Sequence, residues 1–340
     1  MKTVSIIVPV YNVSQYIERC WASLNCQTYP EIEIIFVDDC GTDDSIPKLK
    51  ELISLGHNFP VRIIRHNKNR GLSAARNSGY KVSSGEYVYF LDSDDDISPT
   101  CIEDLVLPTE KKAYDFIVGN YFVNGNVFHS LPPLSQGEIL GNERIMASFS
   151  REWFGYVMAW NKLVKKSFLE ENHISFKEGI IHEDILWSFC VSSRAESMYV
   201  VTKQTYNYNI RKSSIMTSLT IERDLNAYLL VFDAISDFIR EQGCFKNRYQ
   251  YSYYTGKRAG ILYSLLQKGE YALYRKAYDY LRSQYILSPY WAFRKGFISF
   301  PYLVRDLHYA MPGSIGRIYF FLFYLFYYKL RSKQIEGAVW

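Results

Sequence analysis

Two carboxylates that stand one residue apart, Asp92 and Asp94, are the clearest sign of chemistry in this sequence of 340 residues. Because they follow a short apolar run, both side chains can point the same way around a turn. One carboxylate can then hold a divalent cation while the other approaches a ribose or a metal-bound water. Hard oxygen ligands with few protein contacts suit Mg²⁺ or Mn²⁺. The alternative interpretation is an acidic turn whose carboxylates cap the next helix.

A second acidic loop begins at Asp38 and Asp39 and continues to Asp43 and Asp44. A carboxylate at its start can accept the N3–H of a uracil ring, which would select uridine over cytidine. The alternative is an Asx turn, in which one of the acids caps the following helix. We expect that alternative to hold for Asp43 and Asp44 themselves.

These loops follow short β-type runs that alternate with helical segments over the first half of the chain. The β-type runs are Val4–Val8, Glu33–Val37, Val61–Arg65 and Tyr87–Leu91, and the helical segments lie around Val13–Cys26, Ser45–Ser54 and Leu72–Val82. The alternation predicts an α/β fold with a doubly wound, mostly parallel sheet. Ligands of such sheets bind outside the carboxyl ends of the strands, which is where the polar loops lie.

The rest of the chain carries weaker signals. The middle contains a Gly/Asn-rich hairpin candidate at Val123–Val127, and from about residue 216 the pattern is helical and rich in Tyr. Proline-bearing breaks at Ser288–Pro289, Phe300–Pro301 and Pro312–Gly313 divide the tail into short pieces.

Four stretches, VSIIVPVYN, IFVDDCGTDDS, NRGLSAARNSG and GEYVYFLDSDD, have the order and spacing of glycosyltransferase family 2. The chain resembles that family strongly over residues 1–110 and more loosely to about 215. The resemblance implies the GT-A fold, a Rossmann-like, mostly parallel sheet flanked by helices, with a C-terminal helical extension. It also implies a catalytic domain over 1–215, with a nucleotide-sugar half at 1–110 and an acceptor half at 111–215. Residues 216–340 would form the helical, Tyr-rich extension.

The resemblance assigns roles to the donor-side residues. It makes Asp94 the metal ligand, supported by Asp92 near the ribose, and it makes Asp39 the residue that reads the base. Arg76 would lie at the base or the diphosphate. The remaining donor-side candidates are Pro9, Tyr11, Asn12, Ser93 and Arg211, the last on a loop that could close over the diphosphate.

The acceptor side is marked by the acidic pair Glu183 and Asp184, which precedes the apolar run Ile185–Val191. The pair could be a structural acidic first turn, which the helix macrodipole favours. In the family, the Asp of such a pair deprotonates the acceptor hydroxyl, so the resemblance makes Asp184 the general base and Glu183 the fallback. A helix start keeps a carboxylate ionised, as a base requires. Trp160 or Trp153 could stack on a sugar, although core packing is the more common role for such rings.

Together these features predict an inverting, metal-dependent transferase that moves a sugar from a UDP-sugar to a hydroxyl of a glycan or lipid-linked glycan. One alternative is a nucleotidyltransferase-like enzyme, which would need a Gly-rich, basic first loop in place of Pro9–Asn12. The other is a catalytically inactive protein that binds a sugar nucleotide or a membrane. The intact Asp92, Asp94 and Asp184 argue against that second alternative.

The net charge of +4 is concentrated in the tail, because residues 291–340 hold seven Lys or Arg and two Asp or Glu. Such a local excess indicates an anionic partner at the tail rather than a nucleic acid. The uncharged run Ile318–Tyr328, bounded by Arg317 and Lys329, is too short to cross a bilayer but suits an interfacial helix. We therefore expect a cytoplasmic protein, peripheral on the inner face of the membrane. The alternative is a terminal helix buried against the body or in a homodimer.

Overall fold

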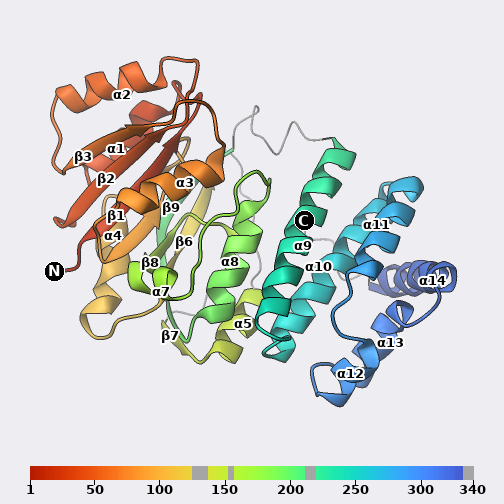
Figure 1. Cartoon of the computed structure of the whole chain (residues 1–340). Coiled ribbons are helices and arrows are strands. Elements are labelled where there is room, and N and C mark those ends of the chain that lie inside the picture. Colours follow the sequence, from red (N-terminus) through yellow and green to blue (C-terminus); the bar gives the residue numbers. More distant parts are fainter. Residues whose placement is uncertain (125–136, 152–156, 211–219, 332–340) are drawn as a thin grey trace. The chain divides into compact units, whose positions relative to one another are not determined.

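The computed structural model describes residues 1–124, 137–151, 157–210 and 220–331 (Figure 1). Contacts divide the chain into two compact units, Met1–Leu219 and Thr220–Trp340. The sequence predicts a boundary near this point, after residue 215. The first unit is built on a sheet, and the described part of the second unit contains helices.

Four parallel strands form one half of the sheet of the first unit. They are β1 (Val4–Val10), β2 (Ile32–Asp38), β3 (Val61–Arg65) and β4 (Tyr87–Phe90), in the spatial order β3-β2-β1-β4. All three pairings are parallel, as the alternating pattern predicts. Their carboxyl ends therefore lie along one edge, and the polar loops after β1, β2, β3 and β4 meet there.

Five further strands extend the sheet beyond β4. They are β5 (Asp96–Ile97), β6 (Phe116–Asn124), β7 (Gly137–Leu140), β8 (Lys162–Lys165) and β9 (Ser197–Asn209). The described residues thus form a nine-stranded sheet, in which β4 pairs with β8 and β6 pairs with both β8 and β9. Only β6 and β9 are parallel among these added pairings, so the parallel character belongs to the first half of the sheet. The hairpin candidate at Val123–Val127 lies mostly outside the described residues.

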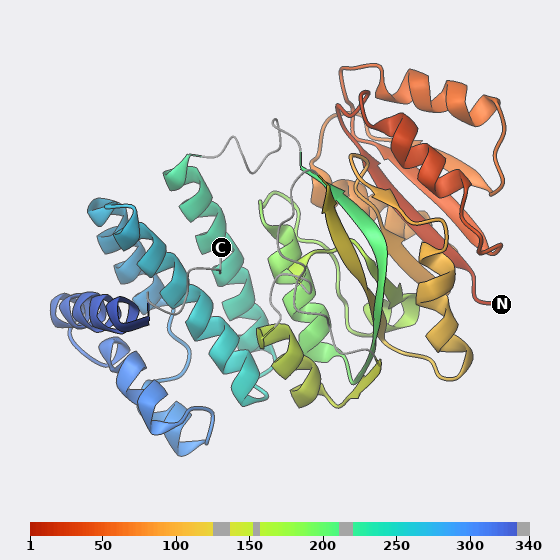
Figure 2. The same ribbon diagram turned by 180° about the vertical axis from the view of Figure 1, so that it is seen from behind.

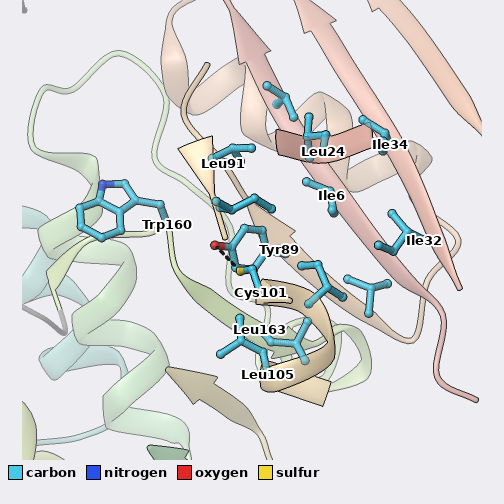
Figure 3. Packing of buried hydrophobic residues seen from close by; sticks show 14 of the residues in the cluster. Ile6, Leu24, Ile32, Ile34, Tyr89, Leu91, Cys101, Leu105, Trp160 and Leu163 are labelled. Carbon is cyan, nitrogen blue, oxygen red and sulfur yellow. Dashed lines mark hydrogen bonds between the residues drawn. The ribbon is translucent and has the colours of Figure 1, made fainter. Parts of the chain in front are cut away.

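One face of the sheet is covered by α1 (Ile17–Asn25), α2 (Ser45–Ser54) and α4 (Cys101–Val106). Because side chains alternate along a strand, Ile6, Val8 and Phe36 point to this face and join the main apolar cluster. Figure 3 shows Ile6, Ile32 and Ile34 of the strands beside Leu24 of α1. In the same view the Cys101 thiol of α4 donates a hydrogen bond to the hydroxyl of Tyr89.

The opposite face carries α3 (Leu72–Val82) and α8 (Glu183–Arg194). Helix α3 packs close, since a Cβ added at Gly79 would approach Ile7 to 2.4 Å and Val37 to 3.1 Å. Helix α8 reaches the same face through Trp187, whose ring lies 5.7 Å from that of Phe90. The two helices therefore share one face although about a hundred residues separate them in sequence (Figure 1). The view from behind shows α1 and α4 on the other face (Figure 2). Among the described residues of this unit, the other helices are η1 (Leu107–Glu110), α5 (Asn142–Arg151) and α7 (Lys166–Glu171).

The second unit consists, over its described part, of helices. They are α9 (Ile221–Glu241), α10 (Arg248–Gln267), α11 (Tyr271–Ser283), α12 (Pro289–Arg294), α13 (Phe300–Asp306), η3 (Leu307–Tyr309) and α14 (Gly313–Arg331). The proline-bearing breaks of the sequence lie at the starts of α12, α13 and α14. Pro fits there because the first turn of a helix leaves its N–H groups without partners. Across the described residues, helix length and apolarity nowhere suffice to cross a membrane.

Candidate active site

Arg76 of α3 is fully buried and binds three carboxylates from distant parts of the chain. Its Nη2 lies 2.8 Å from Oδ1 of Asp92, which follows β4. Its Nη1 lies 2.9 Å from Oε1 of Glu183 and 2.6 Å from Oδ1 of Asp184. The guanidinium thus joins the acidic loop after β4 to the acidic pair that begins α8.

Strand alternation explains why these groups meet. Phe90 points to the face that α3 and α8 cover, and Asp92, two residues further on, stands on the same side of the chain. Arg76 lies in the second turn of α3, and Asp184 lies in the first turn of α8. Each helix therefore brings its charged group to the carboxyl end of β4. The sequence identifies all four residues as candidates, but it does not predict that they touch.

The charges within this cluster alter one another. Burial alone would lower the pKa of Arg76, but the carboxylates of Asp184, Asp92 and Glu183 together raise it well above its usual value. Burial raises the pKa of Glu183, and the charge of Asp184 adds to that rise against the opposing charge of Arg76. Arg76 is consequently a permanent cation that balances buried acids, which is the arrangement in which buried charge is tolerated.

Asp184 is held at both carboxylate oxygens. Oδ1 accepts from Arg76, and Oδ2 accepts from the backbone N–H of Ala159 at 3.2 Å. Helix α8 begins at Glu183, so the acidic pair does form the first turn, as the sequence predicts. His182, which precedes the helix, has a left-handed backbone with φ of 64°. Such a conformation is uncommon for a non-glycine residue and often accompanies a functional site.

Asp39 follows β2 and ties the neighbouring loop to the sheet. Its Oδ1 accepts from the backbone N–H of Arg70 and its Oδ2 from that of Gly71, both at 2.8 Å. His66 Nδ1 lies 2.6 Å from Oδ1, and the carboxylate is almost entirely buried. The role that the sequence assigns to Asp39 therefore has to be shared with this structural one.

Asp38 points to the opposite face from Asp39, as strand alternation requires. It lines a pocket of about 460 Å³, whose lining also includes Asn12, Gly41, Asp43, Lys50 and Arg65. A second pocket of about 370 Å³ shares Arg65 and is lined by residues 65–68 and 70. Arg65 Nε lies 3.2 Å from Oδ2 of Asp38. The carboxyl ends of β1, β2 and β3 are therefore hollowed beside a group of Lys and Arg side chains.

The loops after β1 and β2 are bound to each other. Asn12, with φ of 53°, accepts a hydrogen bond at its side-chain oxygen from the N–H of Thr42 at 2.8 Å. A Cβ at Gly41 would approach this oxygen to 3.0 Å, so a larger residue there would push the loops apart. Pro9 is buried in β1, whereas Tyr11 is 45% exposed at the edge. Asp43 accepts from the N–H of Ser45 and forms the expected Asx turn, whereas Asp44 makes no capping hydrogen bond.

The acidic loop after β4 contains Asp92 and Asp94, the two carboxylates that the sequence assigns to a divalent cation. Arg76 pairs with Asp92, and Arg19 pairs with Asp96 at 3.1 Å. Burial, with the charges of Asp94 and Asp92, raises the pKa of Asp95 to about 8. Ser93, between the two candidate ligands, is buried. Within the described residues no group of three or more His, Cys, Asp or Glu is placed to hold a metal. Mg²⁺ commonly uses one or two carboxylates and completes its shell with phosphate and water, so this loop fits it.

Of the two tryptophans that could stack on a sugar, one lies in the core and the other lies outside the described residues. Trp160 is buried and stacks on Tyr206 at 4.2 Å between centroids, so packing is its observed role. Trp153 and Arg211 lie outside the described residues.

Lys162 and His66 are site neighbours that the sequence does not single out. Lys162 is 1% exposed, and burial lowers its pKa to about 7 although the charge of Asp184 opposes that shift. His66 bridges Asp39 and the hydroxyl of Ser78, the latter at 2.8 Å. A lone Lys at the start of a strand carries no signal of burial, because lysines are usually exposed.

Comparison with protein families gives a match to the model described as glycosyl transferase family 2 over residues 5–172. Glycosyltransferase GlyA of Streptococcus pneumoniae is 34% identical over 69% of this chain and 34% of its own length. Glycosyltransferase GlyG of the same organism is 30% identical over 63% of this chain and 72% of its own length. The chain spans 34%, 62% and 62% of the length of the first three curated relatives it matches.

Among solved structures, S. aureus TarS in complex with UDP-GlcNAc superposes with a TM-score of 0.59 and 24% identity. The match covers 68% of this chain and 66% of that one. A likeness at this level of identity shows a common fold.

Proposed function

Because this chain belongs to glycosyltransferase family 2 and has the GT-A fold, we propose that it transfers a sugar from a UDP-sugar to a hydroxyl group. The observation that carries the proposal is the Arg76 cluster, which sets Asp92 and Asp184 on one guanidinium. One carboxylate belongs to the donor side and the other to the acceptor side. The buried guanidinium of Arg76 would therefore fix the distance between the donor-side carboxylate and the acceptor-side carboxylate.

The uridine of the donor would lie at the carboxyl ends of β1 to β3. The exposed ring of Tyr11 offers a stacking face beside Pro9 and Asn12. Asp39 would accept the uracil N3–H; its Oδ2 carries one hydrogen bond in the structure, and a carboxylate oxygen can accept two. UDP-GlcNAc bound to TarS supports a UDP-sugar as the donor class. Arg211 remains a proposed contact of the diphosphate.

A divalent cation, Mn²⁺ or Mg²⁺, would be held by Asp94 and Asp92, with Ser93 fixing the turn between them. When bound, the cation would neutralise the charge that develops on the departing diphosphate. Arg76 holds one oxygen of Asp92, so the orientation of this ligand is set before the donor arrives. Arg76 itself would act through Asp92 and Asp184, because its guanidinium is buried among carboxylates.

Asp184 would be the general base. The hydrogen bonds from Arg76 and Ala159 fix the orientation of its carboxylate. The acceptor oxygen would attack the anomeric carbon as its proton moves to the Asp184 carboxylate and the bond to the diphosphate breaks. A single in-line displacement inverts the anomeric centre. Glu183 shares Arg76 and is the fallback base.

The acceptor would be a glycan or a lipid-linked glycan, and residues 291–340 would bring the enzyme to the membrane. The helices α12 to α14 display apolar rings to solvent. Tyr290 and Trp291 of α12 are 57% and 56% exposed, and Phe300 of α13 is 66% exposed. On α14, exposed side chains recur at helical spacing along one side: Ile315, Ile318, Leu322, Leu325 and Phe326.

The other side of α14 is buried in its own unit. Phe320 and Tyr324 are buried, and the ring of Phe320 lies 4.9 Å from that of His308. Helix α14 is therefore a packed helix with an apolar outer side, rather than a loose terminal segment. Lys329 to Lys333 of the expected basic rim have side chains outside the description.

Charge favours an anionic lipid surface as the partner of these rings. Between Asp279 and Glu336 the sequence contains one acid, Asp306, and that carboxylate is buried against Arg305. Arg294 and Lys295 are exposed beside the rings of α12. Each basic residue near an anionic surface contributes on the order of 1 kcal/mol. A second copy of the chain would meet the same positive charge, so a homodimer through this face is the less favoured arrangement.

The proposed activity is tested by incubating the full chain with a panel of UDP-sugars and Mn²⁺ and measuring UDP release. We expect release with at least one donor, and its loss in Asp94→Ala or with excess chelator. Asp237→Ala is the matched control, because Asp237 is an exposed acid of α9 that pairs with Arg240.

Two outcomes would overturn the proposal. Full UDP release by Asp94→Ala, with the fold retained, would remove Asp94 from the metal site. Binding of UDP-sugars without turnover of any donor, with acceptor glycans present, would leave an inactive sugar-nucleotide-binding protein.

A further inference from the structure

Lys162 is a buried lysine beside the proposed base, and nothing in the donor or acceptor chemistry accounts for it. It opens β8, is 1% exposed, and faces the charges of Asp184 and Arg76. Its Nζ donates a hydrogen bond to the backbone carbonyl of Met158. Burying an ammonium group on a carbonyl oxygen is unfavourable. A Met or Leu would fill the same space at lower cost, so a structural role alone explains this residue poorly.

The carbonyl of Met158, which accepts the hydrogen bond from Lys162, belongs to a short segment, residues 157–159. Helix α8 also forms hydrogen bonds with this segment. Ser188 of α8 donates from its hydroxyl to the carbonyl of Val157 at 2.6 Å, and the same hydroxyl lies 3.4 Å from the carbonyl of Met158. Ser188 is fully buried. It stands four residues after Asp184, so the two side chains lie on one side of the helix.

One backbone N–H of this segment also donates a hydrogen bond to the helix. The N–H of Ala159 donates to Oδ2 of Asp184 at 3.2 Å. Helix α8 and residues 157–159 are thus joined at two points, through Asp184 and through Ser188. Lys162 adds a third point from β8. The direction of the Ala159 N–H depends on the peptide planes before it, and those planes are fixed by the two clamped carbonyls.

We propose that Lys162 and Ser188 form a clamp on residues 157–159, and that Lys162 is a positioning residue for Asp184. This inference rests on the proposed function, since it takes Asp184 as the base. The clamp holds the Ala159 N–H against one carboxylate oxygen while Arg76 holds the other. The carboxylate then has one orientation toward the acceptor.

The test compares Lys162→Met, Ser188→Ala and the wild type in three measurements. Lys162→Met should lower kcat between about 10- and 100-fold with donor KM little changed, because a misplaced base loses turnover rather than nucleotide binding. Ser188→Ala should lower kcat by less, because it leaves the Lys162 contact with the carbonyl of Met158 in place.

Stability separates this role from a structural one. Lys162→Met removes a buried charge, so resistance to urea should stay the same or increase while kcat falls. The matched control is Lys257→Met: burial lowers the pKa of Lys257 to about 6, but this lysine lies in the helical unit on α10. That variant should keep kcat. A fall in kcat of Lys162→Met that is matched by loss of fold and of donor binding would overturn the clamp, as would an unchanged kcat.

Hydrogen exchange tests the clamp without activity. The amide of Ala159 should exchange about tenfold faster in Lys162→Met and in Ser188→Ala than in the wild type, because its carbonyl neighbours lose their anchors. Unchanged exchange at Ala159 in both variants would overturn the clamp even if transfer is observed. A wild type that transfers no sugar but shows the predicted exchange pattern would contradict the proposed function and leave the clamp standing.

Discussion

The carboxyl edge of β1 to β4 and the helices α12 to α14 depart from ordinary protein surfaces in opposite directions. The edge buries charge, since the side chains of Arg76, Asp39 and Glu183 are all buried. The helices expose apolar rings, among them Trp291, Phe300 and Phe326. Each arrangement is unfavourable in isolation, because a buried charge loses hydration and an exposed ring orders water.

The two regions balance these costs differently. At the edge the partners are internal, because each of these three charges has an opposite charge or a backbone N–H within hydrogen-bond distance. Within the described residues of the helical unit, no side chain covers the exposed rings of α12 to α14. The edge is therefore pre-organised before any ligand binds, whereas the proposed function assigns the cover of the helical surface to a membrane. Disrupting each region should consequently damage different properties.

The largest effect should come from removing the cation at the centre of the edge. Arg76→Met leaves Asp92, Glu183 and Asp184 buried together without their counter-charge. Breaking a buried ion pair in this way costs about 3–5 kcal/mol, which urea unfolding at pH 7 would measure. Arg317→Met is the control, because its ion pair with Asp279 is more exposed and should contribute under about 1 kcal/mol. Equal losses in the two variants would contradict the contrast between the regions.

Next in size is the removal of the base from the same cluster. Asp184→Asn keeps the size of the side chain, but its amide cannot take a proton and can accept only one of the two hydrogen bonds that the carboxylate accepts. We therefore expect kcat to fall by roughly 10²-fold or more. Donor affinity, measured by titration with UDP, should persist because the residue is placed on the acceptor side. A parallel loss of UDP binding would mean that Asp184 supports the donor instead.

The helical surface should respond to charge rather than to unfolding. Replacing Arg294 and Lys295 together by Gln should weaken binding to phosphatidylglycerol-containing vesicles by about 2 kcal/mol, roughly 30-fold, and leave urea stability unchanged. High salt should have the same effect, and vesicles of phosphatidylcholine alone should bind weakly. Lys268→Gln, at the exposed position directly after α10, is the control.

Ring removal extends this test. Trp291→Ser with Phe293→Ser should weaken vesicle binding, whereas Tyr271→Ser, an equally exposed ring on α11, should not. If the double variant instead changes the sedimentation of the free protein, the surface is occupied by a second copy of the chain.

The smallest effect concerns pH within the helical unit. Burial and, to a smaller extent, the charges of Arg305, Arg258 and Arg282 together lower the pKa of His308 to about 3. The unfolded chain has its usual pKa near about 6.5, so it binds the proton first as pH falls. Stability that is present above pH 6.5 is therefore lost as pH drops through the window toward 3, by at most about 1.4 kcal/mol per pH unit.

His308→Gln should remove this loss of unfolding free energy between pH 7 and pH 5, measured by urea unfolding followed by circular dichroism. His57→Gln, at an exposed position between α2 and β3, should leave it in place. An identical pH dependence in all three proteins would show that His308 is not the group responsible.

Much of the first unit could be predicted from the sequence, because its signals are local. Alternating β-branched runs and helical periodicity predict β1 to β4 and α1 to α3 to within a few residues, with α2, α3 and β3 at their observed bounds. Polar loops at the strand ends follow from the same pattern, so Asp39, Asp92 and Asp94 could be chosen before any contact was known. The breaks at Pro289 and Pro301 likewise lie at helix starts.

What the sequence by itself determined, then, is which residues stand at the carboxyl ends of the strands, since period and loop chemistry are properties of neighbours in the chain. Only the tertiary structure decided which of them meet. Arg76 reaches Asp184 across 108 positions because α3 and α8 pack on the same face of one sheet. The burial of Lys162, the hydrogen bonds of Asp39 and the outward side of α14 likewise depend on what packs beside each residue. A one-dimensional pattern carries no record of such neighbours, because packing brings together residues that the sequence leaves far apart.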